Sequence, residues 1–150
     1  YAPWEKRDSL LVTQKEFTSD LEKNYAIMKT FGIQKSEVHY FLPPYEWYND
    51  SIANWTKQFG LQLVNYSPGT ISAADYTYPE LKNYRSSETI MASIKKYEAS
   101  SSKGLNGFIL ILHIGTDPKR TDKFYKQLPE LIQWLKEKGY KLERVDELLK

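Results

Sequence analysis

The chain has 150 residues, no cysteine, and 21 Lys and Arg against 19 Asp and Glu, which gives a net charge of +2. Hydrophobic residues make up 41% of it and aromatic residues 15%, which suffices for a folded core and argues against intrinsic disorder. The lack of cysteine excludes disulfides, thiolate zinc sites and a cysteine nucleophile. The small, interspersed charge disfavours nucleic-acid binding, and no apolar run is long enough to span a membrane.

Hydrophobic periodicity predicts helices that alternate with short strands. Capping and breaking residues limit them: a capping box at Thr13 begins the first helix, and Pro43-Pro44 ends the first strand, because proline cannot donate to a sheet. In chain order, we predict a helix at 14–31, a strand at 38–42, a helix from Asn49 or Asp50 to Gly60, a strand at 61–66, a helix from Ser86 or Ser87 to about Gly104, a strand at 108–112, a helix at 123–138, a strand at 140–145 and a short helical tail.

This order predicts an α/β fold with a mostly parallel sheet and outer helices. The run 108–112 is apolar throughout, as expected of a strand that is buried on both faces. Four strands cannot close a barrel, so the sheet is either open or completed by strands that precede Tyr1. Because the chain begins at Tyr1 rather than at methionine, we interpret it as a piece of a longer protein.

Polar residues follow the predicted strands, at the edge where α/β folds place active sites. His113 comes directly after the strand 108–112 and is suited to general acid or base catalysis, with Asp75 of the long loop 67–85 as its orienting carboxylate. The alternative is a structural histidine that bonds a loop carbonyl. The other histidine, His39, lies at the opposite end of its strand and is predicted to be a surface residue.

Aromatic residues gather at the same predicted edge. Tyr45 and Trp47 follow Pro43-Pro44, and Tyr76 lies in the long loop, so these rings are candidates for stacking on a sugar. The alternative is that they pack their own loops. The two histidines are far apart and form no H-x-x-x-H or H-E-x-x-H motif, so the sequence predicts no metal ligands within this chain.

Several short segments suggest a family by their order and spacing. They are Phe41-Leu42-Pro43-Pro44-Tyr45, Ser67-Pro68-Gly69-Thr70 with Asp75-Tyr76, Ile111-Leu112-His113 and Gly139-Tyr140. Together they resemble the later motifs of the polysaccharide deacetylases with a NodB homology domain, over nearly the whole chain. The resemblance implies that residues 1–150 are the C-terminal part of one catalytic domain: a partial, distorted (β/α) barrel whose first strands are missing.

The resemblance also implies an activity, namely a hydrolase that removes acetyl groups from an N- or O-acetylated carbohydrate with a divalent cation, typically zinc. The cation ligands belong to early motifs that this chain lacks, so we expect it to bind no metal and to be inactive alone. The roles that carry over are His113 as general acid, Asp75 as its orienting carboxylate, the backbone N–H of Tyr45 as oxyanion donor, and Ile111 as part of the acetyl pocket.

One departure from the family favours a different function. Leu42 stands where the family usually has an arginine that pairs with the catalytic base, and leucine cannot donate those hydrogen bonds. The alternative is a non-catalytic carbohydrate-binding or scaffold module on the same fold. A flavodoxin-like domain is disfavoured, because no glycine-rich phosphate loop follows a strand.

The expected partners follow from these interpretations. They are an acetylated carbohydrate, the missing N-terminal half of the domain, and a second copy of the chain through the exposed edge of the strand 38–42. The family resemblance suggests an extracytoplasmic location.

Overall fold

The structure is a computed structural model that describes residues 1–3 and 5–149. The chain divides into two compact units, Tyr1–Asn65 (unit 1) and Tyr66–Lys150 (unit 2). Each unit contains its own cluster of buried apolar side chains. The expectation that both units belong to one catalytic domain stays a prediction.

Unit 1 contains the helices α1 (Gln14–Thr30) and α2 (Asp50–Gln58), both close to their predicted positions. The capping box begins α1 as expected, with Thr13 N–H donating to Glu16 Oε2 at 2.7 Å. The Asn49 side chain caps α2 by accepting from Ile52 N–H at 3.1 Å. The fully or almost fully buried residues of this core are Phe17, Leu21, Tyr25, Ile52 and Leu61.

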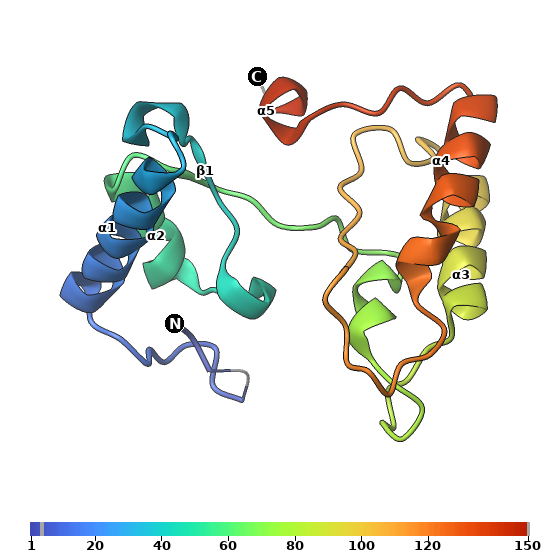
Figure 1. Ribbon diagram of the computed structural model, residues 1–150, viewed down its shortest axis with the longest axis horizontal. Helices are drawn as coiled ribbons and strands as arrows, with labels where there is room; N and C mark the ends of the chain where they lie inside the picture. Colours follow the sequence, from blue (N-terminus) through green and yellow to red (C-terminus); the bar gives the residue numbers. More distant parts are fainter. Residues whose placement is uncertain (4, 150) are drawn as a thin grey trace. The chain divides into compact units, whose positions relative to one another are not determined.

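The sheet of unit 1 has two parallel strands, β1 (Tyr40–Phe41) and β2 (Gln62–Leu63), which α2 connects (Figure 1). Tyr40 lies opposite Gln62, and Phe41 opposite Leu63. The prediction of parallel strands joined by a helix is confirmed here, but both strands are shorter than predicted. The fold is therefore mixed α/β, and the partial barrel with outer helices stays a prediction.

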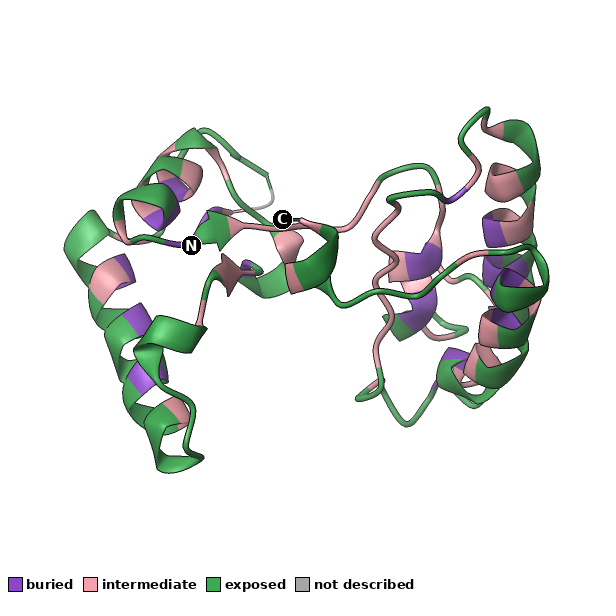
Figure 2. Cartoon of the chain, turned by 90° about the horizontal axis from the view of Figure 1, so that it is seen from above, coloured by how far each residue is buried: buried purple, intermediate pink, exposed green. Residues whose placement is uncertain are grey.

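Unit 2 contains α3 (Ser87–Ser100), α4 (Leu128–Glu137) and the short α5 (Val145–Leu148). The helices α3 and α4 lie side by side, and Lys95 Nζ is 3.0 Å from Glu130 Oε1 between them (Figure 1). Their facing sides are buried (Figure 2), and the buried residues of this core are Ile90, Met91, Ile94, Leu105, Phe124, Leu131 and Leu135. The predicted helix at 123–138 begins at Leu128 instead, after the 3₁₀ helix η4 (Phe124–Gln127).

The predicted strands 108–112 and 140–145 are wrong, because neither segment forms a strand in the described part of the chain. Phe108, Leu110 and Leu112 do pack against the core of unit 2, yet all five residues of 108–112 are only half-buried. Ser67 bonds to this run at Ile109: its N–H donates to the Ile109 carbonyl at 2.9 Å, and its Oγ accepts from Ile109 N–H at 3.0 Å. An apolar run predicts burial, but it does not supply the partner strand that a sheet needs.

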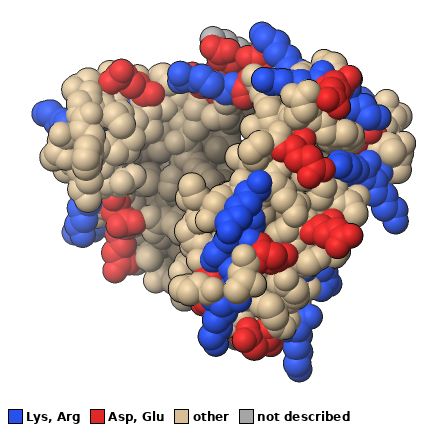
Figure 3. Space-filling view, turned by 45° about the vertical axis from the view of Figure 1, so that its right-hand side comes forward, with Lys and Arg blue, Asp and Glu red and all other residues tan. Residues whose placement is uncertain are grey.

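The surface carries both charges. On the face shown in Figure 3, acidic and basic side chains lie interspersed, in agreement with the nearly balanced composition. Among the described residues, no helix combines the length and the apolar character needed to cross a membrane.

Candidate functional site

The loop 67–85 folds into the 3₁₀ helix η3 (Ser72–Tyr76), which carries Asp75 into the interior of unit 2. Both carboxylate oxygens of this buried residue contact His113. Oδ2 accepts from the His113 backbone N–H at 2.6 Å, and Oδ1 lies 2.6 Å from the ring Nδ1. Because a carboxylate only accepts, Nδ1 is the donor in this contact. The structure thus brings together the two residues that the sequence predicts to pair.

The His113 ring keeps an open side. Its side chain is 31% exposed, whereas that of Asp75 is fully buried. The Tyr76 ring meets the imidazole edge to face at 5.7 Å between centroids and holds it from a second direction. With Nδ1 bound to Asp75, the remaining ring nitrogen, Nε2, is the atom available to a ligand.

Ile111 lies two residues before His113 in the run 108–112 and is half-buried. Phe108, Leu110 and Leu112 pack against the helices of unit 2, whereas the alternate residues Ile109 and Ile111 are not part of that core. The predicted role of Ile111 in an acetyl pocket stays a prediction.

Tyr45 and Trp47 belong to unit 1, in the turn that follows β1. Their ring centroids are 5.5 Å apart, and their exposed fractions are 77% and 37%. Tyr45 and Glu46 have φ angles of 59° and 58°, in the left-handed region that non-glycine residues rarely adopt. The Asn65 side chain donates to the Glu46 carbonyl at 3.0 Å and braces this strained turn.

The backbone N–H of Tyr45 differs from those of its neighbours. Glu46 N–H donates to the Pro43 carbonyl and Trp47 N–H to the Pro44 carbonyl, at 2.9 and 3.3 Å. Within the described turn, no such backbone bond uses the Tyr45 N–H. Its predicted role as an oxyanion donor stays a prediction.

Among the described residues, no group of three or more His, Cys, Asp or Glu side chains is gathered so that it could hold a metal ion. Both oxygens of Asp75 already contact His113. The expectation that the cation ligands lie outside this sequence stays a prediction.

Arg120 is a buried residue near the site that the sequence analysis missed. Its side chain is fully buried, and its guanidinium donates to four protein oxygens. The Tyr84 ring lies against it, at 5.5 Å from the guanidinium carbon. Burial, and then the hydrogen bond and charge of Asp122, raise the pKa of Tyr84, while the charge of Arg120 opposes them. A lone arginine in a polar run gives no sequence signal of burial.

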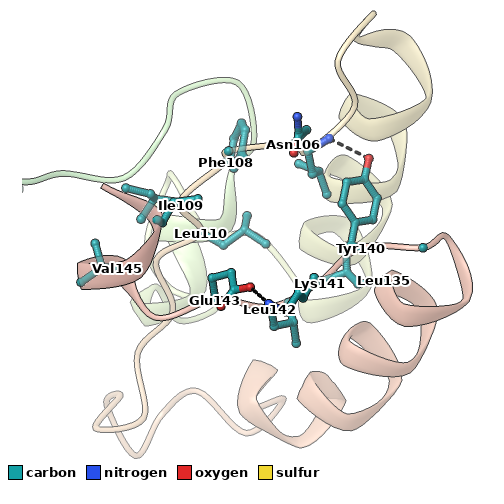
Figure 4. Close-up of a pocket in the computed structure, with 14 residues that line it drawn as sticks. Asn106, Phe108, Ile109, Leu110, Leu135, Tyr140, Lys141, Leu142, Glu143 and Val145 are labelled. Atoms are coloured by element: carbon teal, nitrogen blue, oxygen red, sulfur yellow. Dashed lines mark hydrogen bonds and ion pairs between the residues drawn. The ribbon is translucent and has the colours of Figure 1, made fainter. Parts of the chain in front are cut away.

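Unit 2 also contains an apolar pocket of about 560 Å³ (Figure 4). The segment 105–110 forms one wall, and residues 139–143 with α5 form the other. Tyr140 Oη accepts from Leu105 N–H at 2.9 Å, and Lys141 pairs with Glu143. Asp75 and His113 are not among the residues that line this pocket.

No protein-family model matches the chain, and no curated protein has a significant sequence match to it. The likeness to the polysaccharide deacetylases therefore stays a prediction from the motifs.

Proposed function

We propose that this chain supplies the general acid of a metal-dependent carbohydrate deacetylase, with His113 as the proton donor. The observation that supports this most directly is the double contact of Asp75 with His113, at 2.6 Å to the backbone nitrogen and 2.6 Å to the ring. A histidine that only bonded a loop carbonyl would not need a buried carboxylate at both its backbone nitrogen and its ring Nδ1.

The chemistry of this pair is proton transfer at Nε2. With Asp75 accepting from Nδ1, the second proton of the imidazolium lies on Nε2. Delivered from there, it would protonate the sugar nitrogen or oxygen as its bond to the acetyl carbon breaks, so that an amine or an alcohol leaves. In the polysaccharide deacetylases, which the chain resembles, a divalent cation polarises the acetyl carbonyl. Here the ligands of that cation would come from outside this sequence.

The test uses the complete gene product that contains this chain and measures acetate release from acetylated oligosaccharides. We expect His113→Ala to lower kcat by roughly a hundredfold or more, because general acid catalysis contributes ~10² to 10⁴. Added imidazole should restore part of the rate if the variant lacks only a proton donor. His39→Ala is the matched control, since His39 is exposed and lies in unit 1. A wild-type rate in His113→Ala would refute the general-acid role.

A non-catalytic carbohydrate-binding module is the second candidate. The exposed Tyr45 and Trp47 rings favour it, as does Leu42 in place of the family arginine. In that case Trp47→Ala should weaken oligosaccharide binding at least about tenfold, as truncation of a central aromatic contact does. Phe31→Ala is the control, since Phe31 is 79% exposed at the end of α1. Binding that depends on Trp47, without acetate release, would favour the module over the enzyme.

A further inference from the structure

Arg120 connects two segments that carry the Asp75–His113 pair. The first is the turn with Asp75: Arg120 Nη1 donates to the Thr77 carbonyl at 2.6 Å, two residues after Asp75. Thr77 ends η3, because both its N–H and its hydroxyl donate to the Ala74 carbonyl. Arg120 therefore holds the end of the helical turn that positions Asp75.

The second segment is the loop that runs from His113 to Arg120 itself. Arg120 N–H donates to the Asp117 carbonyl at 3.0 Å. Lys123 Nζ closes the same loop by donating to the carbonyl of Thr116, its hydroxyl and the carbonyl of Asp117, at 3.1, 2.9 and 2.6 Å. The part of the loop from Thr116 to Arg120 is thus braced internally, and it begins three residues after His113.

The remaining donors of Arg120 fix it in place. Nη1 also donates to the Arg85 carbonyl, Nη2 to Ser87 Oγ and Nε to the Asp122 carbonyl, each at 3.0 Å. The Asp122 carboxylate lies 3.4 Å from Nη2 and offsets the buried charge. This geometry needs the planar fork of arginine, because the three donors of a lysine radiate from a single atom.

We infer that Arg120 is a positioning residue for the Asp75–His113 pair, which it sets by gripping the Thr77 carbonyl from the far end of the His113 loop. This coupling between Arg120 and the Asp75–His113 pair is a property of the fold. Only its contribution to catalysis rests on the proposed function.

The test is Arg120→Lys in the full chain, with hydrogen exchange as the readout. We expect the His113 backbone N–H, which Asp75 accepts, to exchange at least about tenfold faster relative to the N–H of Ile94, a buried residue of α3. The ratio of the two exchange rates corrects for a general loss of stability, because such a loss would accelerate exchange of both amides. The NMR signal of the ring nitrogens should also show loss of the Nδ1–H tautomer.

Ser87→Ala is the matched control. It removes one acceptor of Arg120 at the start of α3 and leaves the Thr77 carbonyl bound. We expect it to destabilise unit 2 while changing the exchange ratio less than about twofold. An unchanged ratio and an unchanged tautomer in Arg120→Lys would overturn the inference.

If Arg120→Lys fails to fold, the coupling is tested instead by amide hydrogen exchange of the wild-type chain at increasing denaturant concentration. The amides of His113 and Arg120 should then open together with one free energy, and opening of His113 at clearly lower denaturant would contradict the coupling. Activity separates the two proposals. An altered ratio with no acetate release from the wild type would support the positioning role and count against the deacetylase.

Discussion

At the scale of single residues, the two histidines differ in whether a carboxylate binds and orients the ring. His39 is exposed and its ring makes an edge contact with the neighbouring Tyr40. His113 is held by a carboxylate that has no exposed surface. The same side chain is thus a surface group in one unit and an oriented donor in the other, because the loop 67–85 delivers Asp75 to it.

Asp75→Asn tests how much this contact stabilises unit 2. An amide has one accepting oxygen, so its NH₂ group faces one of the two His113 donors and cannot accept from it. We expect the free energy of unfolding to fall by about 1 to 3 kcal/mol, the usual result of leaving a buried donor unpaired. Denaturant unfolding measures the change. Asp117→Asn, on the exposed part of the His113 loop, should change it by less than about 0.5 kcal/mol.

At Tyr45 we expect a substitution to increase stability, because its backbone is strained and its ring is largely exposed. Tyr45→Gly removes a left-handed cost of about 1 to 2 kcal/mol and adds a smaller entropic cost of glycine. We expect the free energy of unfolding to rise by up to about 1 kcal/mol. Thermal unfolding checks the sign, and a clear loss of stability would mean that the contact between the Tyr45 and Trp47 rings outweighs the strain.

At the scale of elements, the start of α1 depends on two reciprocal hydrogen bonds between Thr13 and Glu16. The Thr13 backbone bond, followed by that of its hydroxyl, lowers the pKa of Glu16 from its ordinary value of 4.5. A lowered pKa in the folded state means that the contribution is complete above the ordinary value and is lost as the pH falls through the lowered one.

Acidification should therefore fray the first turn of α1 below about pH 4.5. Glu16→Gln should show no such step, because glutamine does not titrate in this range. Amide exchange of the first helical turn between pH 3 and 6 checks both expectations.

In a separate variant, Thr13→Ala should lower the free energy of unfolding by about 1 kcal/mol at neutral pH, the typical value for a lost N-cap.

Helices were predictable from the sequence because their signals are local. Thr13, Asn49 and Ser86 each cap a helix within three residues, and these starts are correct. The run 108–112 was not predictable as it stands, because a strand depends on a partner that may lie anywhere in the chain. The Asp75–His113 contact was predicted from the place of His113 after the apolar run and of Asp75 in the long loop, although the run is not a strand. The burial of Arg120 depends on acceptors more than thirty residues away, at Thr77, Arg85 and Ser87.

At the scale of the whole molecule, the two-stranded sheet of unit 1 leaves the outer edge of β1 without a strand partner in the described part of the chain. Leu42, directly after β1, is 48% exposed. Open edges with apolar neighbours invite pairing with another chain.

We expect the 150-residue chain to self-associate at high concentration, and Leu42→Lys to weaken that association, since a charge beside an edge strand opposes pairing. Phe31→Lys is the control, because it removes an exposed apolar ring from the end of a helix. Sedimentation over a range of concentrations measures both. A wild-type chain that stays monomeric throughout would contradict the expectation.

The Arg120 contacts have a consequence for how the site could be redesigned. Three of its four partners, Thr77, Arg85 and Asp122, are bound through their main-chain oxygens, which every amino acid possesses. Residues 78–84 are thus an excursion closed at its base, where Arg85 N–H also donates to Thr77 Oγ1 at 3.3 Å. Its tip can be exchanged for another sequence while the base holds Asp75 in place. Loop grafting within residues 79–83, which keeps the Tyr84 ring against Arg120, is therefore a route to new sequences in this loop that leaves the Asp75–His113 contact undisturbed.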